Sequence, residues 1–104
     1  MRRAIIPFGL AVAVVAAFAH AAASQEGRSL ATAVLAGSCA NCHGTDGHSP
    51  GAIPSLAGKK EDELLKSLGA FKSGDAKATV MTRIAKGYTD EQLAELARYF
   101  AHRP

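Results

Sequence analysis

Large aromatic side chains are scarce in this sequence. The 104 residues include no tryptophan, two tyrosines and four phenylalanines, and only two cysteines and two methionines. A chain of this length forms at most one domain. Because so small a domain rarely completes its core with side chains alone, we expect a disulfide, a metal or another internal staple to fill its centre.

The N-terminal segment lacks acidic residues and is typical of a secretory signal peptide. Residues 1–3 (MRR) form a short positive region, and an uncharged run rich in Ala and Val follows as far as Ala23 and ends with A-x-A spacing. We therefore expect residues 1–23 to be a cleaved signal peptide and residues 24–104 to be a mature domain in the periplasm. An uncleaved membrane anchor is the alternative. The run contains a proline, a glycine and many alanines, however, so it is poorly suited to form a membrane-spanning helix.

The formal charge of the chain gives no reason to expect nucleic-acid binding. The whole chain has 12 Lys and Arg against 9 Asp and Glu, a formal charge of +3. Removal of Arg2 and Arg3 with the signal leaves 10 basic against 9 acidic residues, a formal charge of +1. The mature domain is thus expected to bind no nucleic acid and to have no stable membrane insertion.

Hydrophobic spacing predicts an all-α fold of a few short helices. The first helix runs from Ser29 into Cys39, and the last begins after Thr89, whose pairing with Gln92 three residues later is a capping box. On the last helix the apolar residues from Leu93 to Phe100 would face the core, and Glu95 and Arg98 would face water. The other two helical segments are expected over residues 60–72 and 82–86.

Long connections separate these helices, and no segment reads as a strand. Residues 43–58 are dense in Gly, Ser, Pro and Asp, residues 75–81 lack a periodic pattern, and residues 24–28 are polar and expected to be loose. Loops of this length in so small a domain are expected to wrap around a bound group.

Both cysteines lie in the pentapeptide CANCH, residues 39–43. A structural zinc site needs four ligands, and one cysteine pair with His48 and His102 fits the spacing of no common zinc module. A thioredoxin-like dithiol would follow a strand, and none precedes Cys39. A disulfide across so short a loop would stabilise little.

The pattern C-x-x-C-H is instead the attachment signal for a c-type haem. Cys39 and Cys42 would each add to a vinyl group of the haem, and His43 would then be held under the iron as its proximal ligand. Export agrees with this chemistry, which takes place outside the bacterial cytoplasm. We therefore expect one covalently attached haem c with axially ligated iron.

Met81 is the expected second axial ligand, since Met1 leaves with the signal and no other methionine remains. It follows His43 by 38 residues, in a connection predicted to be non-helical. An ordinary core methionine is one alternative. Ligation of the iron by His48 is another alternative, although it lies only five residues after His43, a short connection for reaching the other face of the haem.

Pro54 is expected to lie close to the haem ligand. A backbone carbonyl at this point can accept a hydrogen bond from the free ring nitrogen of His43 and fix the orientation of the ring. An ordinary turn proline is an equally good interpretation of the same residue.

With these residues, the mature chain resembles a class I cytochrome c. The resemblance is carried by the helix that ends in residues 39–43, the proline loop at 53–56, the methionine loop at Met81 and the C-terminal stretch LARYF, residues 96–100. It implies that the first and last helices cross and pack. In this chain the contact would bring Ala31 and Leu35 against Leu96, Tyr99 and Phe100.

Three stretches are similar, more narrowly, to the haem subunit of flavocytochrome c sulfide dehydrogenase. They are CANCHGTDG (39–47), AFKSG (70–74) and VMTRIAKGYTDEQL (80–93). The resemblance implies an FAD-containing flavoprotein partner that oxidises sulfide and passes electrons singly to the haem, and a downstream electron acceptor. Well-known members carry two haem domains in this subunit, whereas this chain has one motif and room for one haem.

Two other functions stay open at this point. A free, diffusible cytochrome c would shuttle electrons between respiratory complexes through weak, salt-sensitive encounters at surface lysines such as Lys59, Lys60, Lys72 and Lys86. A gas sensor would have an open or weakly held sixth position at the iron. In none of these functions does the chain offer an obvious acid–base pair for catalysis of its own.

Overall fold

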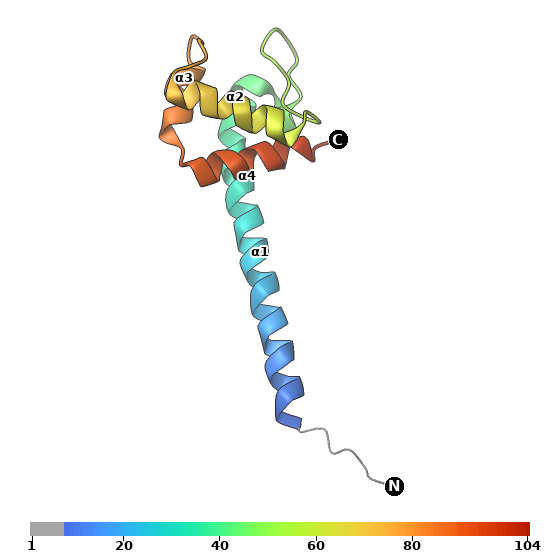
Figure 1. Cartoon of the computed structure of the whole chain (residues 1–104). Coiled ribbons are helices and arrows are strands. Elements are labelled where there is room, and N and C mark those ends of the chain that lie inside the picture. The colour runs from blue at the N-terminus through green and yellow to red at the C-terminus, as the bar shows by residue number, and fades with distance from the viewer. Residues whose placement is uncertain (1–7) are drawn as a thin grey trace. The chain divides into compact units, whose positions relative to one another are not determined.

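The computed structural model describes residues 8–104, with side chains from Phe18 onward except at positions 23, 24 and 26, and these residues form helices and loops without a β-strand (Figure 1). The all-α prediction is therefore confirmed. The chain divides into two units, Met1–Leu30 and Ala31–Pro104, and the candidate site lies in the second. The elements are α1 (Phe8–His43), η1 (Thr45–Gly47, a 3-10 turn), α2 (Glu61–Ser73), α3 (Met81–Ile84), η2 (Ala85–Gly87, a 3-10 turn) and α4 (Asp90–Ala101).

The predicted signal segment, residues 1–23, lies partly outside the described residues. Its described part is helical from Phe8 onward and continues through residues 24–28, so the expectation of a loose segment there is wrong. Residues 24–28 contain no alanine, but the segments on either side of them are rich in alanine, the strongest helix former, and the helix runs through. Among the residues that the structure describes, no helix is both long and apolar enough to cross a membrane.

The core of the second unit lies where α4 packs against both α1 and α2 (Figure 1). Its buried hydrophobic residues are Ala36, Leu64, Leu96, Ala97 and Phe100. Leu35, Tyr99 and other half-buried side chains pack around this cluster. The contact between the first and last helices that the cytochrome resemblance implied is therefore present, with small residues from both helices at its centre.

The face of α1 in this contact differs from the prediction at one position. Ala31 is exposed, whereas Thr32 and Ala36, one turn apart, are buried. The reason is a hydrogen bond, since the Thr32 hydroxyl donates to the Glu95 carboxylate on α4 at 3.0 Å. The expectation that Glu95 faces water is corrected by the same contact, because this side chain is half-buried.

The start of α4 is as predicted. The Thr89 hydroxyl accepts from the Gln92 amide at 3.1 Å, and the Gln92 side chain accepts from the Thr89 amide at 2.9 Å. These two bonds satisfy amides that the first turn of a helix leaves unpaired. Leu93, Leu96, Ala97 and Phe100 are all buried, as their spacing indicated.

Met81 does not lie in a non-helical connection, as the sequence suggested, but is the first residue of α3. The amides of Arg83 and Ile84 both donate to the carbonyl of Val80, at 2.9 and 3.1 Å. The first helical turn therefore begins at Val80, within the connection predicted over residues 75–81. α3 and η2 both pack against α2.

Candidate functional site

The last turn of α1 carries Cys39, Cys42 and His43. The helix continues past its predicted end at Cys39 as far as His43. Residues three and four apart lie on the same face of a helix, so the two thiols and the imidazole share one face. Cys39 is half-buried and Cys42 exposed, and both are free thiols. Burial raises the pKa of the Cys39 thiol.

A glycine turn directly after His43 ends the helix. Gly44 has a φ of +84°, and its amide donates to the Ala40 carbonyl at 3.0 Å. A Cβ at Gly44 would overlap the backbone carbonyl of His48, so a larger residue does not fit there. A Cβ at Gly47 would lie 2.8 Å from a ring carbon of Phe100, so this turn packs directly against α4.

The ring of His43 is held by the proline loop. Its Nδ1 lies 2.5 Å from the carbonyl oxygen of Pro54. A carbonyl oxygen only accepts, so Nδ1 carries the proton, and Nε2 of the neutral ring keeps a lone pair for a metal. The loop is fixed on both sides of Pro54, because the Ser49 amide donates to Ser55 Oγ at 2.9 Å and the Leu56 amide to the Gly47 carbonyl at 2.8 Å.

Exposed apolar side chains flank both candidate axial ligands. Ile53, next to Pro54, is 44% exposed, and Val80, next to Met81, is 46% exposed. Met81 is itself half-exposed, and the core cluster of the described residues does not include it. A flat apolar group bonded at residues 39–43 would cover such side chains. The donor set and its apolar surroundings therefore fit a haem.

Sequence reasoning missed one contact at the site. The hydroxyls of Ser38 and Tyr88 lie 2.7 Å apart and join the end of α1 to the segment that follows α3. The position of Ser38 directly before Cys39 was the one available signal. A hydrogen bond between residues 50 positions apart leaves no periodic trace in a sequence.

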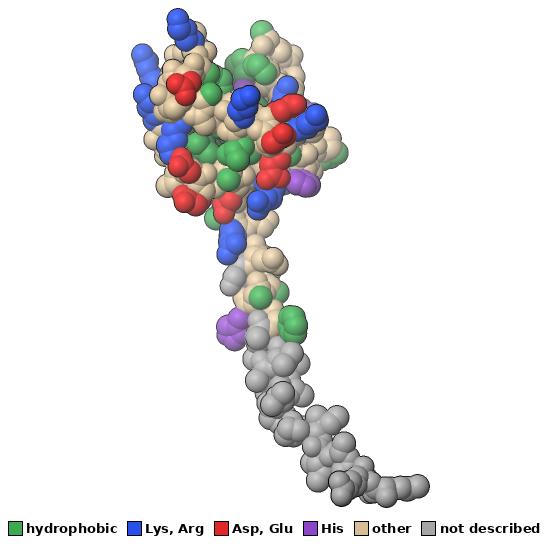
Figure 2. Space-filling model, viewed as in Figure 1, with side chains coloured by type: hydrophobic (Ala, Val, Ile, Leu, Met, Phe, Trp, Pro, Cys, Tyr) green, Lys and Arg blue, Asp and Glu red, His purple; other side chains and the backbone are tan. Residues whose placement is uncertain are grey.

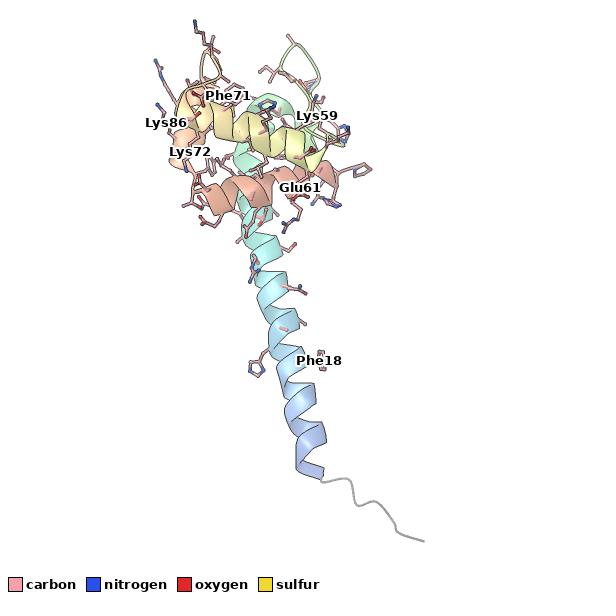
Figure 3. The ribbon with its side chains drawn as sticks, in the orientation of Figure 1. Phe18, Lys59, Glu61, Phe71, Lys72 and Lys86 are labelled. Atoms are coloured by element: carbon pink, nitrogen blue, oxygen red, sulfur yellow. The ribbon has the colours of Figure 1, made fainter. Side chains whose placement is uncertain are left out.

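The lysines considered for docking do not form one group. Lys59 and Lys60 precede α2, whereas Lys72 lies in its last turn, roughly 18 Å further along the helix. Figure 3 accordingly places Lys59 near one end of α2, and Lys72 and Lys86 near the other. Lys72 is paired with Asp90 at 2.7 Å. Acidic and basic side chains are interspersed on the face that α2 and α4 present in Figure 2.

A small helical domain with two thiols and an oriented imidazole at a helix end defines a c-type haem protein. The chain belongs to the cytochrome c family, whose sequence model, described as Cytochrome c, matches residues 24–103. It therefore has the class I cytochrome c fold, binds haem c covalently and transfers electrons.

The similar proteins are bacterial cytochromes. The chain is 48% identical over 69 residues to the cytochrome subunit of sulfide dehydrogenase of Chlorobaculum tepidum, an alignment that covers 66% of this chain and 63% of that protein. It is 40% identical over 84 residues to cytochrome c4 of Pseudomonas aeruginosa, covering 80% of this chain and 40% of that one. It is 39% identical over 69 residues to cytochrome c-554(548) of Halomonas halodenitrificans, an alignment that covers 62% of this chain and 83% of that protein. The chain thus spans less than two thirds of the length of the first two relatives.

Proposed function

We propose that the chain is the haem-bearing electron acceptor of a flavoprotein that oxidises sulfide. The observation that carries this proposal is the 48% identity to the cytochrome subunit of sulfide dehydrogenase. The FAD-containing partner performs the sulfide chemistry, and this chain accepts electrons one at a time and passes them to a downstream acceptor. Residues 1–23 direct the chain to the periplasm and are then removed.

The site residues have separate parts in this function. Cys39 and Cys42 would form the two thioether bonds to the haem, and His43 and Met81 would hold its iron. When bound, the haem supplies one-electron oxidation and reduction. The Pro54 carbonyl, 2.5 Å from His43 Nδ1, keeps the ring in the tautomer and orientation that ligation needs.

The environment of the haem tunes its reduction potential. Methionine ligation raises the potential of a haem, as does the exclusion of water from its faces. Ile53 and Val80, both exposed beside the ligands, would cover the haem and keep water from the iron. The chain thus contributes position and potential to the reaction, and no acid, base or nucleophile.

A free electron carrier is the second candidate. It is favoured by the similarity to cytochrome c-554(548), whose length the alignment covers to 83%. The two lysine groups at opposite ends of α2 would then make transient, salt-sensitive contacts with redox partners.

Gentle purification from a periplasmic extract discriminates the two functions. We expect flavin absorbance to co-elute with the haem, and sulfide to reduce the haem of this fraction rapidly. The matched control is the recombinant haem protein alone, which sulfide should reduce slowly because it lacks the flavin. A flavin-free native protein that sulfide reduces no faster than this control would favour the free carrier.

A further inference from the structure

We propose that Ser38 and Tyr88 form a hydrogen-bonded clamp that holds the Met81 segment against the end of α1 and controls how easily Met81 leaves the iron. This inference rests on the proposed role of Met81 as an axial ligand. Tyr88 and Ser38 are positioning residues, because neither is assigned a bond to the haem.

The direction of the hydrogen bond follows from the contacts of Ser38. Its Oγ lies 2.8 Å from the Leu35 carbonyl and 2.7 Å from the Tyr88 hydroxyl. A serine hydroxyl has one proton, and a carbonyl oxygen only accepts, so Ser38 donates to Leu35. Tyr88 must then donate to Ser38. Tyr88→Phe would keep the ring and lose this donor.

The Met81 end of the clamp is a short continuous helical segment. α3 begins at Met81 and passes directly into η2, after which the Tyr88 amide donates to the Ala85 carbonyl at 3.3 Å. Ala85, in the middle of the segment, is 1% exposed, and the Tyr88 ring packs against the core cluster. A movement of Tyr88 is therefore transmitted to Met81, seven residues earlier.

The other end of the clamp is next to the covalent anchor of the haem. Ser38 directly precedes Cys39, one of the two proposed attachment residues, on the same helix. The segment after Tyr88 is fixed as well, because Thr89 is the N-cap of α4. The clamp thus connects the helix end that would hold the haem to the segment that carries Met81, the second proposed iron ligand.

Loss of the clamp should make displacement of Met81 by an added ligand easier. A hydrogen bond of this type changes an equilibrium by about fivefold, which corresponds to about 1 kcal/mol. We therefore expect Tyr88→Phe and Ser38→Ala each to tighten the binding of imidazole to the ferric holoprotein about fivefold. Because both variants remove the same bond, the double variant should bind imidazole no more tightly than either single variant.

The experiment titrates the ferric holoprotein with imidazole and follows the loss of the sulfur-to-iron charge-transfer band. Tyr99→Phe is the matched control, since Tyr99 also packs on the core but its hydroxyl lies 3.5 Å from Asp46, outside the clamp. Its imidazole affinity should equal that of the wild type. Ser38→Ala removes the same hydrogen bond without changing Tyr88, so it separates loss of the bond from any effect of altering the Tyr88 side chain.

The outcomes separate the clamp from the ligand assignment. If the wild type shows the band but neither clamp variant changes the imidazole affinity, the clamp is wrong and the assignment of Met81 stands. Equal tightening by Tyr99→Phe also overturns it, because the effect would then be one of general stability. A wild-type protein without the band overturns the assignment of Met81 and the clamp with it.

Discussion

Met81→Ala is expected to abolish the sulfur-to-iron charge-transfer band of the ferric protein and to lower its reduction potential. The thioether is a soft ligand that favours ferrous iron, and axial ligands tune haem potentials over a range of roughly 0.8 V. We expect the potential to fall by a sizeable part of that range. Optical spectra and a redox titration of the purified holoprotein measure both effects.

His48→Ala is the matched control for this variant. His48 is exposed in the loop after η1, and the loss of its imidazole should leave the band and the potential unchanged. If Met81→Ala kept the wild-type spectrum, the sixth ligand would have to be His48 or water. A gas-binding function with an open coordination position would then gain support.

The double variant Cys39→Ala/Cys42→Ala is expected to be largely unfolded at 25 °C. Among the described residues the buried hydrophobic side chains number seven, and three of these are alanines, so little apolar area is removed from water. Without the covalent haem, the long loops at 48–60 and 74–80 would lose the group that we expect them to surround. A bound group that only the folded chain can hold contributes its binding energy to folding.

Far-ultraviolet circular dichroism during heating tests this expectation. The control is Ser67→Ala, an exposed position on α2, which should keep the cooperative transition of the holoprotein. A cooperative thermal transition in the haem-free double variant would show that side chains alone complete the core. The argument from the small size of the domain would then fail.

Local sequence signals predicted much of the fold. The capping box of Thr89 and Gln92 and the apolar face of α4 depend on residues three and four positions apart, and such patterns can be read directly. The bounds of α2 differ from the prediction by one residue, and Gly74 in the left-handed conformation ends this helix as expected of glycine.

Contacts between distant residues were not predictable in this way. The burial of Thr32 depends on Glu95, 63 positions away, whereas the contact implied by the cytochrome resemblance placed Ala31 there instead. The clamp of Ser38 and Tyr88 spans 50 positions. The helical start at Met81 depends on a turn that closes on the Val80 carbonyl, for which the sequence has no capping residue.

The central claim is that one haem is attached covalently through Cys39 and Cys42. The most direct test is the intact mass of the protein after denaturation and acid–acetone extraction, with the chain produced in a bacterium that attaches c-type haem. The account predicts the mass of the polypeptide plus one haem, and the mass of the polypeptide alone for the double alanine variant. Extraction of the haem from the wild-type chain, leaving only the polypeptide mass, would contradict it.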